Sequence, residues 1–259
     1  TPSNNITATA PDYTDLWTNS GNYASAFYNE GEAGIDGSTE EKAYEIRTAE
    51  QLALLAYRIN TSSTNSTYKS LYYVQTADID LSLHYWDAIG TTSYYFRGHY
   101  DGGGYTISGL YTENGYSSPY SYQGLFGYVR GQSKTDKAII KNIGIIDSNI
   151  QGYQYVGGVV GDASYSTITN CYNTGSVTGS SSSVGGVVGS SDHSTIENCY
   201  NTGFVTGDRY VGGVVGETYR CTITNCYNTG NIIGDGERVG GVVGYAYSYS
   251  TITYCYNTG

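Results

Sequence analysis

A six-residue segment, Val-Gly-Gly-Val-Val-Gly, occurs four times in the second half of this chain. The spacings are 28, 27 and 28 residues, and the copies begin at Val156, Val184, Val211 and Val239. Each copy is followed by a Thr-Ile pair and then by the segment Cys-Tyr-Asn-Thr-Gly. A fixed period of about 20 to 50 residues is the signature of a repeat architecture, so each copy is expected to form one unit of a stack.

Each repeat contains three short segments with strand-like sequence, separated by Gly, Asn, Ser and Asp. In the first copy these segments are residues 156–160, 167–172 and 176–178. They are rich in β-branched residues and show no helical period, which favours strands. We therefore predict an all-β fold, a parallel β-helix (β-solenoid) with about 28 residues and three strands per coil. Equivalent residues of successive coils would then stack about 4.8 Å apart.

Alternation along each strand predicts which side chains face the core. The inward positions are Ile168, Ile196, Ile223, Ile252, Val177, Val205 and Ile232. The cysteines three residues beyond the isoleucines would point outward unless the chain bends, and Asn170 tolerates the left-handed backbone of a corner. We therefore predict a structural cysteine column inside the coil, made of Cys171, Cys199, Cys226 and Cys255. Outside it lies a tyrosine column, Tyr172, Tyr200, Tyr227 and Tyr256, and the next corner carries an asparagine ladder, Asn173, Asn201, Asn228 and Asn257.

The sequence before the repeats has a different pattern. Residues 1–39 contain few apolar side chains and are predicted to be an N-terminal extension packed partly on a cap. Residues 40–110 are predicted to form that cap and the first degenerate coils, with a strand at 44–46 and a helix near 48–60. Thr48 and Gln51 form a capping box at the start of this helix. We expect residues 61–67 to be a loop, 74–81 a strand, and 111–259 the solenoid repeats.

The charge balance excludes some partners. The chain carries 23 Asp and Glu against 12 Lys and Arg, a net charge of −11, with 14% charged residues and 31 tyrosines. Such a surface repels the phosphates of nucleic acids and anionic membranes. No stretch approaches the roughly 18 apolar residues that a spanning helix needs. We therefore predict neither a nucleic-acid partner nor a membrane span.

Four further segments have distinctive sequences. They are residues 44–52 (Tyr-Glu-Ile-Arg-Thr-Ala-Glu-Gln-Leu), 77–81 (Ala-Asp-Ile-Asp-Leu), 101–110 (Asp-Gly-Gly-Gly-Tyr-Thr-Ile-Ser-Gly-Leu) and 124–127 (Gly-Leu-Phe-Gly). In this order they resemble adhesin-like bacterial surface proteins of the GLUG-motif class, which include non-catalytic N-terminal regions of IgA-cleaving metallopeptidases. The resemblance covers about residues 40–259 and implies a secreted or wall-attached right-handed β-helix without catalytic residues. The metallopeptidase motif His-Glu-x-x-His is missing, because none of His84, His99 and His193 precedes a glutamate.

The cysteine count of five is odd, so at least one thiol stays unpaired within a monomer. The parallel Cβ vectors of the cysteine column suit disulfides poorly, and we predict free, buried thiols. Cys221 occupies a position that is serine in the other repeats, and it is predicted to be the reactive or partnered thiol. Zinc requires a tetrahedral cage, which such a column does not offer.

The acidic residues give a weaker signal. Asp78, Asp80 and Asp101 lie near turns and could bind Ca²⁺, but Asp is common at turns, and we expect no metal or cofactor. Four other acidic residues are predicted to lie in loops between strands: Asp162, Asp192, Asp208 and Glu217. No acidic column recurs from repeat to repeat, which disfavours the paired carboxylates of a glycosidase.

Two alternative functions stay open. The first is a carbohydrate-binding or carbohydrate-cleaving module, in which a face of aromatic side chains contacts the sugar. Thr-x-Thr pairs at 167/169, 222/224 and 251/253 resemble the flat face of ice-binding solenoids, although Glu197 interrupts the array.

The sequence as a whole predicts a non-enzymatic structural or adhesive solenoid, extracellular or at the cell surface. Its tyrosine column either stabilises the solenoid by ring stacking or contacts a host protein or glycan. The chain stops within a repeat, which predicts an exposed strand edge that either meets further repeats or self-associates end to end into filaments. Asn5, Asn60 and Asn65 begin N-x-Ser/Thr sequons, which matter only in a host that glycosylates them.

Overall fold

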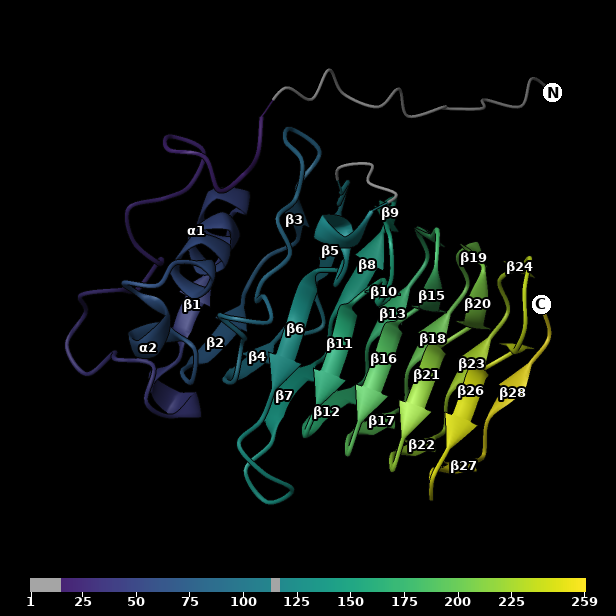
Figure 1. Cartoon of the computed structure of the whole chain (residues 1–259). Helices are drawn as coiled ribbons and strands as arrows, with labels where there is room; N and C mark the ends of the chain where they lie inside the picture. Colours follow the sequence, from purple (N-terminus) through teal and green to yellow (C-terminus); the bar gives the residue numbers. More distant parts are fainter. Residues whose placement is uncertain (1–14, 113–116) are drawn as a thin grey trace, which may run out of the picture.

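The computed structural model describes residues 15–112 and 117–259, and these form a β-solenoid with a helical cap at one end (Figure 1). Each strand pairs in parallel with the equivalent strand of the next coil, for example Val156 with Val184. The all-β fold class and the coil of about 28 residues are therefore confirmed. None of the helices within the described ranges has the length and apolarity needed to span a bilayer.

Five parallel sheets run along the solenoid. Sheet 1 has eight strands: β1 (Tyr44–Ile46), β2 (Tyr72–Gln75), β4 (His99–Asp101), β7 (Ala138–Lys141), β12 (Ser166–Thr169), β17 (Thr195–Glu197), β22 (Thr222–Thr224) and β27 (Thr251–Thr253). Sheet 2 has seven: β3 (Ile79–Asp80), β5 (Thr106–Ser108), β8 (Gly144–Ile146), β13 (Tyr172–Asn173), β18 (Tyr200–Asn201), β23 (Tyr227–Asn228) and β28 (Tyr256–Asn257).

The other three sheets begin further along the chain. Sheet 3 consists of β6 (Phe126–Arg130), β11 (Val160–Ser164), β16 (Val188–Asp192), β21 (Val215–Tyr219) and β26 (Val243–Tyr247). Sheet 4 consists of β9 (Asn149–Gly152), β14 (Ser176–Gly179), β19 (Val205–Gly207) and β24 (Ile232–Gly234). Sheet 5 consists of β10 (Val156–Gly157), β15 (Ser182–Gly185), β20 (Arg209–Gly212) and β25 (Val239–Gly240).

Two of the three strands expected in each coil are divided by a corner. The first expected segment forms β10 and β11, and the second forms β12 and β13, while the third is the single strand β14. A complete coil therefore has five short strands rather than three. Each additional corner changes the direction of the chain, and the five sheets enclose a core filled by side chains.

Three corners of each coil use a left-handed backbone on residues other than glycine. In the first complete coil they are Tyr155 with φ 57°, Tyr165 with φ 48° and Asn170 with φ 54°. The bend predicted at Asn170 is confirmed, and it turns the next side chain, Cys171, into the core. The equivalent corners of other coils use Asn142, Asn198, Asn225, Tyr254, His193, Arg220, Tyr249, Ser183, Tyr210 and Arg238.

The glycine pair of each Val-Gly-Gly-Val-Val-Gly segment lies where the backbone is crowded, by its own coil at the first glycine and by the next coil at the second. A Cβ atom added to Gly185 would lie 2.0 Å from the carbonyl oxygen of Val188. At Gly186 it would lie 2.2 Å from the carbonyl oxygen of Gly213. Real Cβ atoms do not approach an oxygen this closely, so no other residue fits at these positions.

The core consists of stacked apolar columns. Ile168, Ile196 and Ile223 have no exposed surface, whereas Ile252 in the last coil is 41% exposed. At Val159 and Val160, where alternation leaves the inward residue undecided, both side chains are fully buried. The corner between sheets 5 and 3 makes this possible, because it lets two consecutive side chains point inward.

The cap contains two α-helices and a 3₁₀-helix. The predicted helix is present as α1 (Ala49–Asn60), and its buried side Leu52, Leu55 and Ile59 packs into the apolar core at the first coils. The Gln51 backbone N–H donates to Thr48 Oγ1 at 3.4 Å, as a capping box requires. The Gln51 Oε1 accepts from the backbone N–H of Arg47, whereas a capping box uses the N–H of the next residue, Thr48.

Three details of the cap and its surroundings differ from prediction. The loop expected at residues 61–67 contains a short helix, α2 (Asn65–Tyr68), in which the buried Asn65 amide donates to the Ile59 carbonyl at 2.7 Å. The strand expected at 74–81 is two strands, β2 and β3. Two 3₁₀-helices were not predicted, η1 (Glu40–Lys42) and η2 (Ser118–Tyr120).

The N-terminal extension packs on the cap where it is described. The Trp17 and Phe27 side chains are each 2% exposed, and Trp17 Nε1 donates to the Leu81 carbonyl at 3.0 Å. The Asn5 sequon lies outside the described residues. The Asn60 amide is held by Ala88 and Gly90, and Asn65 is 6% exposed, so both of these sequons use their amides inside the fold.

A buried asparagine ladder runs between sheets 2 and 4. The Nδ2 of Asn173 donates to Asn201 Oδ1 at 2.9 Å, and the Nδ2 of Asn201 donates to Asn228 Oδ1 at 2.8 Å. Asn201 Nδ2 also donates to the Gly203 carbonyl, and all three asparagines have no exposed surface. The Asn201 amide therefore hydrogen-bonds to its own corner and to both neighbouring coils, whereas Asn173, which begins the ladder, bonds to one neighbouring coil.

We expect Asn201→Ala to lower the free energy of unfolding by about 2–4 kcal/mol, because it leaves several buried partners without hydrogen bonds. Urea unfolding followed by circular dichroism measures this change. Asn231→Ala is the matched control, since Asn231 is exposed and its loss should cost less than about 0.5 kcal/mol. Equal stability of the two variants would contradict a structural role for the ladder.

Candidate functional site

The tyrosine column of sheet 2 is the most regular surface feature. Successive rings of Tyr172, Tyr200, Tyr227 and Tyr256 have centroids 4.8, 4.9 and 5.0 Å apart and interplanar angles of 2°, 4° and 3°. The column starts at Tyr172 because the preceding coil has Gly144, where an added Cβ would lie 2.2 Å from the Tyr172 ring.

The rings present both an apolar edge and hydroxyl groups along the solenoid axis. Tyr172, Tyr200 and Tyr227 are partly buried, and Tyr256 is 55% exposed. Each stacked pair is worth about 0.5–1.5 kcal/mol beyond its area burial, so the column stabilises the coils. The same rings form a continuous surface of the kind that tyrosine contributes to binding interfaces.

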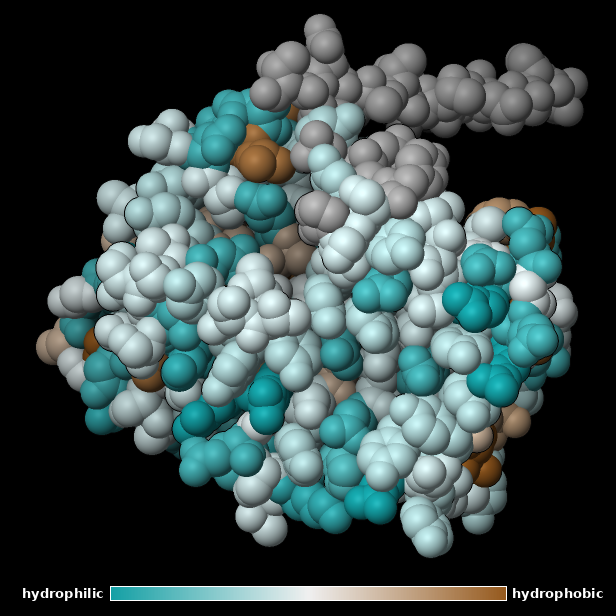
Figure 2. All heavy atoms as spheres, in the orientation of Figure 1, coloured by the Kyte–Doolittle hydropathy of each residue, from teal (hydrophilic) through white to brown (hydrophobic). Residues whose placement is uncertain are grey.

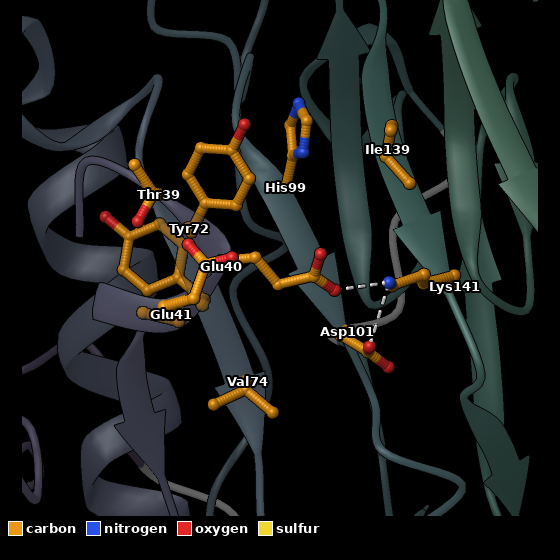
Figure 3. Close-up of a pocket in the computed structure, with 11 residues that line it drawn as sticks. Thr39, Glu40, Glu41, Tyr72, Val74, His99, Asp101, Ile139 and Lys141 are labelled. Atoms are coloured by element: carbon orange, nitrogen blue, oxygen red, sulfur yellow. Dashed lines mark hydrogen bonds and ion pairs between the residues drawn. The ribbon is translucent and has the colours of Figure 1, made fainter.

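A pocket lies where the cap meets sheet 1 (Figure 3). It is a cavity of about 480 Å³, with η1 as one wall and the outer face of β2, β4 and β7 as its floor. Lys141 Nζ donates to Glu40 Oε1 at 2.8 Å and lies 3.1 Å from Asp101 Oδ2. The single ammonium of Lys141 thus pairs with two carboxylates, and the pocket lining keeps a net negative charge, since Glu41 lines it as well.

His99 also lines this pocket, and its ring centroid lies 4.2 Å from that of Tyr72. Burial, with the nearby Lys141 ammonium, lowers the pKa of the His99 imidazole. Burial raises the pKa of Asp101, but hydrogen bonds from Asn142, Gly103 and Lys141 outweigh it and lower the pKa overall. The pocket therefore holds a neutral imidazole beside a carboxylate that is already paired, an arrangement suited to fastening η1 to the sheet.

The cysteine column lies inside the coil next to the tyrosines. Cys171, Cys199 and Cys226 have no exposed surface, Cys255 is partly exposed, and all five thiols of the chain are free. Each column thiol donates to the carbonyl two residues earlier, as Cys171 Sγ does to Thr169 at 3.2 Å. Burial raises the pKa of the Cys199 thiol, which keeps it protonated and unreactive.

Cys221 belongs to a second column, at the corner between sheets 3 and 1. The Ser166 N–H donates to Ser194 Oγ at 3.0 Å, the Ser194 N–H to Cys221 Sγ at 3.2 Å, and the Cys221 N–H to Ser250 Oγ at 3.3 Å. The Cys221 thiol is 2% exposed and takes the place of a serine hydroxyl. The reactive or partnered role of Cys221 stays a prediction.

The repeated surface columns and their buried counterparts correspond to a known sequence motif. The family model described as the GLUG motif matches residues 152–178, 180–206, 207–233 and 235–259. Residues 152–259 are four GLUG repeats. The coils that precede these GLUG repeats continue the same sheets 1 and 2 with divergent sequence.

A solved structure from Bacteroides ovatus is similar to this chain. It is described as a "putative immunoglobulin A1 protease", and the match has a TM-score of 0.66 with 23% identity over 85% of this chain and 68% of that chain. At this identity the similarity shows the shared fold alone. No curated protein matches the chain.

The carboxyl groups of the three aspartates considered for Ca²⁺ all accept hydrogen bonds from the backbone: Asp78 links two neighbouring coils, and Asp80 and Asp101 each close a turn. Asp78 Oδ1 accepts from the Thr106 N–H at 2.8 Å, Asp80 Oδ1 from that of Ser82 at 2.9 Å, and Asp101 Oδ1 from that of Gly103 at 2.9 Å. In residues 15–112 and 117–259, no three His, Cys, Asp or Glu side chains form a group that could hold a metal.

The outward threonines of the GLUG repeats lie in register on sheet 1, as Thr222 and Thr224 do beside Thr251 and Thr253. Glu197 lies in register between Thr169 and Thr224 and interrupts the array. The ice-binding face stays a prediction.

Sequence reasoning misplaced three acidic residues of the GLUG repeats. Asp162, Asp192 and Glu217 lie on β11, β16 and β21 rather than in loops, whereas Asp208 lies between strands as expected. The signal in the sequence is the offset from Val-Gly-Gly-Val-Val-Gly: Asp162 and Glu217 directly follow its last glycine, and Asp192 lies two residues further along the equivalent strand, so all three fall on sheet 3.

We expect thiol titration of the folded chain to find Cys255 reacting first and the other four cysteines only after unfolding. Cys255 is the partly exposed member, and we expect it to react roughly tenfold faster or more. Reaction with a chromogenic disulfide reagent, with and without urea, measures this. Cys255→Ser should abolish the fast phase. Rapid reaction of Cys221 in the native state would instead support its prediction as the reactive thiol.

Proposed function

We propose that this chain is a non-enzymatic structural and adhesive solenoid that acts outside the cell or at its surface. The tyrosine column carries the proposal, because four parallel rings form a rigid amphipathic strip that costs little conformational entropy to present. The GLUG resemblance and the protein of similar fold described as an immunoglobulin A1 protease support an extracellular setting.

A structural role for the Figure 3 pocket agrees with this proposal. Its lysine is held between two carboxylates, and η1 is thereby fastened across the sheet. Incubation of the chain with oligosaccharides, followed by measurement of newly formed reducing ends, tests the alternative of a carbohydrate-cleaving β-helix. Release of reducing ends would contradict the non-enzymatic proposal.

We expect the double variant Tyr200→Thr with Tyr227→Thr to lose adhesion while keeping the fold. Threonine suits a strand, so the expected loss in stability is about 1 kcal/mol per stacked pair. Binding to immobilised mucin, fibronectin and immunoglobulin A measures adhesion, with a decrease of roughly tenfold expected for any ligand that wild type binds.

The matched control for adhesion is Thr224→Ser with Thr253→Ser, two outward residues of sheet 1 that hydrogen-bond to each other at 3.0 Å. This control should bind as wild type does. The adhesive proposal is wrong if the tyrosine double variant binds as tightly as the control, or if wild type binds none of the three proteins.

The edge of the last coil is the second part of the proposal. Ile233, Val239 and Ile252 are 48%, 44% and 41% exposed there, and Figure 2 shows brown hydrophobic atoms at this end of the molecule. A shallow pocket at the same edge is lined by Ile232, Val239 and Asn257. Pairing of this edge with another solenoid edge would bury apolar surface and complete the hydrogen bonds of β24 to β28.

We expect the chain to self-associate through this edge, and to do so more as its concentration rises. Sedimentation velocity and electron microscopy measure the assembly. A roughly hundredfold range of protein concentration is needed, because a weak monomer–oligomer equilibrium shifts only gradually with concentration. Ile252→Lys adds charge to the exposed edge and should keep the chain monomeric, whereas Thr206→Lys on the side of β19 should not. Monomers at every concentration would refute end-to-end assembly.

A further inference from the structure

The outer face of sheet 3 differs from the tyrosine column, because its residues change from coil to coil. One in-register column on this face reads Tyr128, Asp162, Ser190, Glu217 and Tyr245, from β6 to β26. A carboxyl, a hydroxyl and a second carboxyl thus lie between two tyrosines. Four coil steps at about 4.8 Å each give the column a length of about 19 Å.

Aromatic rings cluster at both ends of this column. At the β6 end, the Tyr122 ring lies 4.9 Å from Tyr155 and 5.9 Å from Tyr128. Burial and then the Asp162 carboxylate raise the pKa of Tyr122 to about 12, so its hydroxyl stays protonated beside Asp162.

At the β26 end, four rings form a second cluster. The Tyr245 ring lies 5.1 Å from Tyr210 and 5.0 Å from Tyr247, and Tyr247 lies 5.0 Å from Tyr219. Tyr247 is 37% exposed, so its ring is open to a ligand at the rim. Tyrosine faces of this kind stack on apolar faces of other molecules at little entropic cost.

The strip between the clusters is polar and partly prearranged. Ser183 Oγ donates to Glu217 Oε2 at 2.7 Å, and Asp192 Oδ1 lies 2.6 Å from His193 Nδ1. Burial raises the pKa of Asp162 to about 7, with the nearby Asp192 and Glu217 charges adding to it and a Ser190 hydrogen bond opposing it. Near neutral pH the strip therefore contains both donors and acceptors.

The charge of the face is close to balanced. The Arg238 guanidinium lies 4.0 Å from the Tyr245 ring centroid, and that of Arg220 lies 4.9 Å from the Tyr219 ring centroid. These two cations offset much of the charge of Asp192 and Glu217. A ligand that is itself strongly charged, such as a basic peptide, gains little from this balance, whereas a neutral ligand rich in hydroxyl groups can use every group on the strip.

We propose that the outer face of sheet 3 binds an uncharged oligosaccharide that lies along the solenoid axis. The sugar rings stack on the tyrosines at the two ends, and their hydroxyls exchange hydrogen bonds with Asp162, Ser190 and Glu217. This site lies on a different sheet from the tyrosine column, so it goes beyond the proposed adhesive role of that column. The two proposals are tested with different variants.

The test is calorimetric titration of the whole chain with four neutral probes, cellohexaose, xylohexaose, mannohexaose and laminarihexaose. We expect at least one to bind with a Kd below about 1 mM. Glu217→Gln and Tyr247→Ala should each weaken that binding roughly tenfold. Tyr247 lies at the rim and is partly exposed, so its loss tests the site without depending on the core.

Tyr254→Ala is the matched control, because Tyr254 is 85% exposed at the corner between sheets 1 and 2. It should leave binding unchanged. The proposal is overturned if no probe binds, or if Glu217→Gln and Tyr247→Ala bind as wild type does. It is also overturned if hexalysine binds more tightly than every sugar and loses its binding in Glu217→Gln, which would assign the face to a cationic peptide.

Discussion

The left-handed corner is the constraint on which this solenoid depends. Without Asn170 at φ 54°, the chain would continue straight, and Cys171 would point outward instead of filling the core. A left-handed backbone is unfavourable for most residues and is tolerated best by Gly, Asn and Asp. Its cost is offset because the thiol or hydroxyl that follows each of two corners donates to a nearby carbonyl, as Cys171 and Ser194 do.

The buried polar columns and the apolar columns support each other. An asparagine amide in the core is unfavourable unless each of its groups is bonded, and only an identical residue in the next coil bonds it at the right place. Asn201 meets that condition because Asn173 and Asn228 lie directly beside it. The same register brings Ile168, Ile196 and Ile223 into one column, so a shift of one coil by one residue would break both kinds of contact at once.

The parts of the fold that could be predicted are those whose residues carry a local sequence signal. The coil length, the helix α1 and the inward turn of Cys171 followed from periodicity, a capping box and the tolerance of Asn for a corner. The corners at Tyr165, His193 and Arg220 could not be predicted, because Tyr and Arg do not favour a left-handed backbone and the three residues share no common signal. Their conformation is imposed by the neighbouring coils. Missing the Tyr165 corner, where β11 ends, placed Asp162 in a loop; the two additional strands of each coil come from the divisions between β10 and β11 and between β12 and β13.

Repetition itself distinguishes structural positions from the rest of the surface. Glycine pairs, inward isoleucines and ladder asparagines recur in every GLUG repeat because each is required by contact with its copy in the next coil. An outward position on sheet 3 has no such requirement, and it changes from Asp162 to Ser190 to Glu217 in successive coils. The tyrosine column is outward yet constant, which fits its contribution to stacking between coils. Variable outward columns can therefore acquire a ligand without loss of the fold, in addition to constant columns such as the tyrosines, which must keep their stacking while they bind.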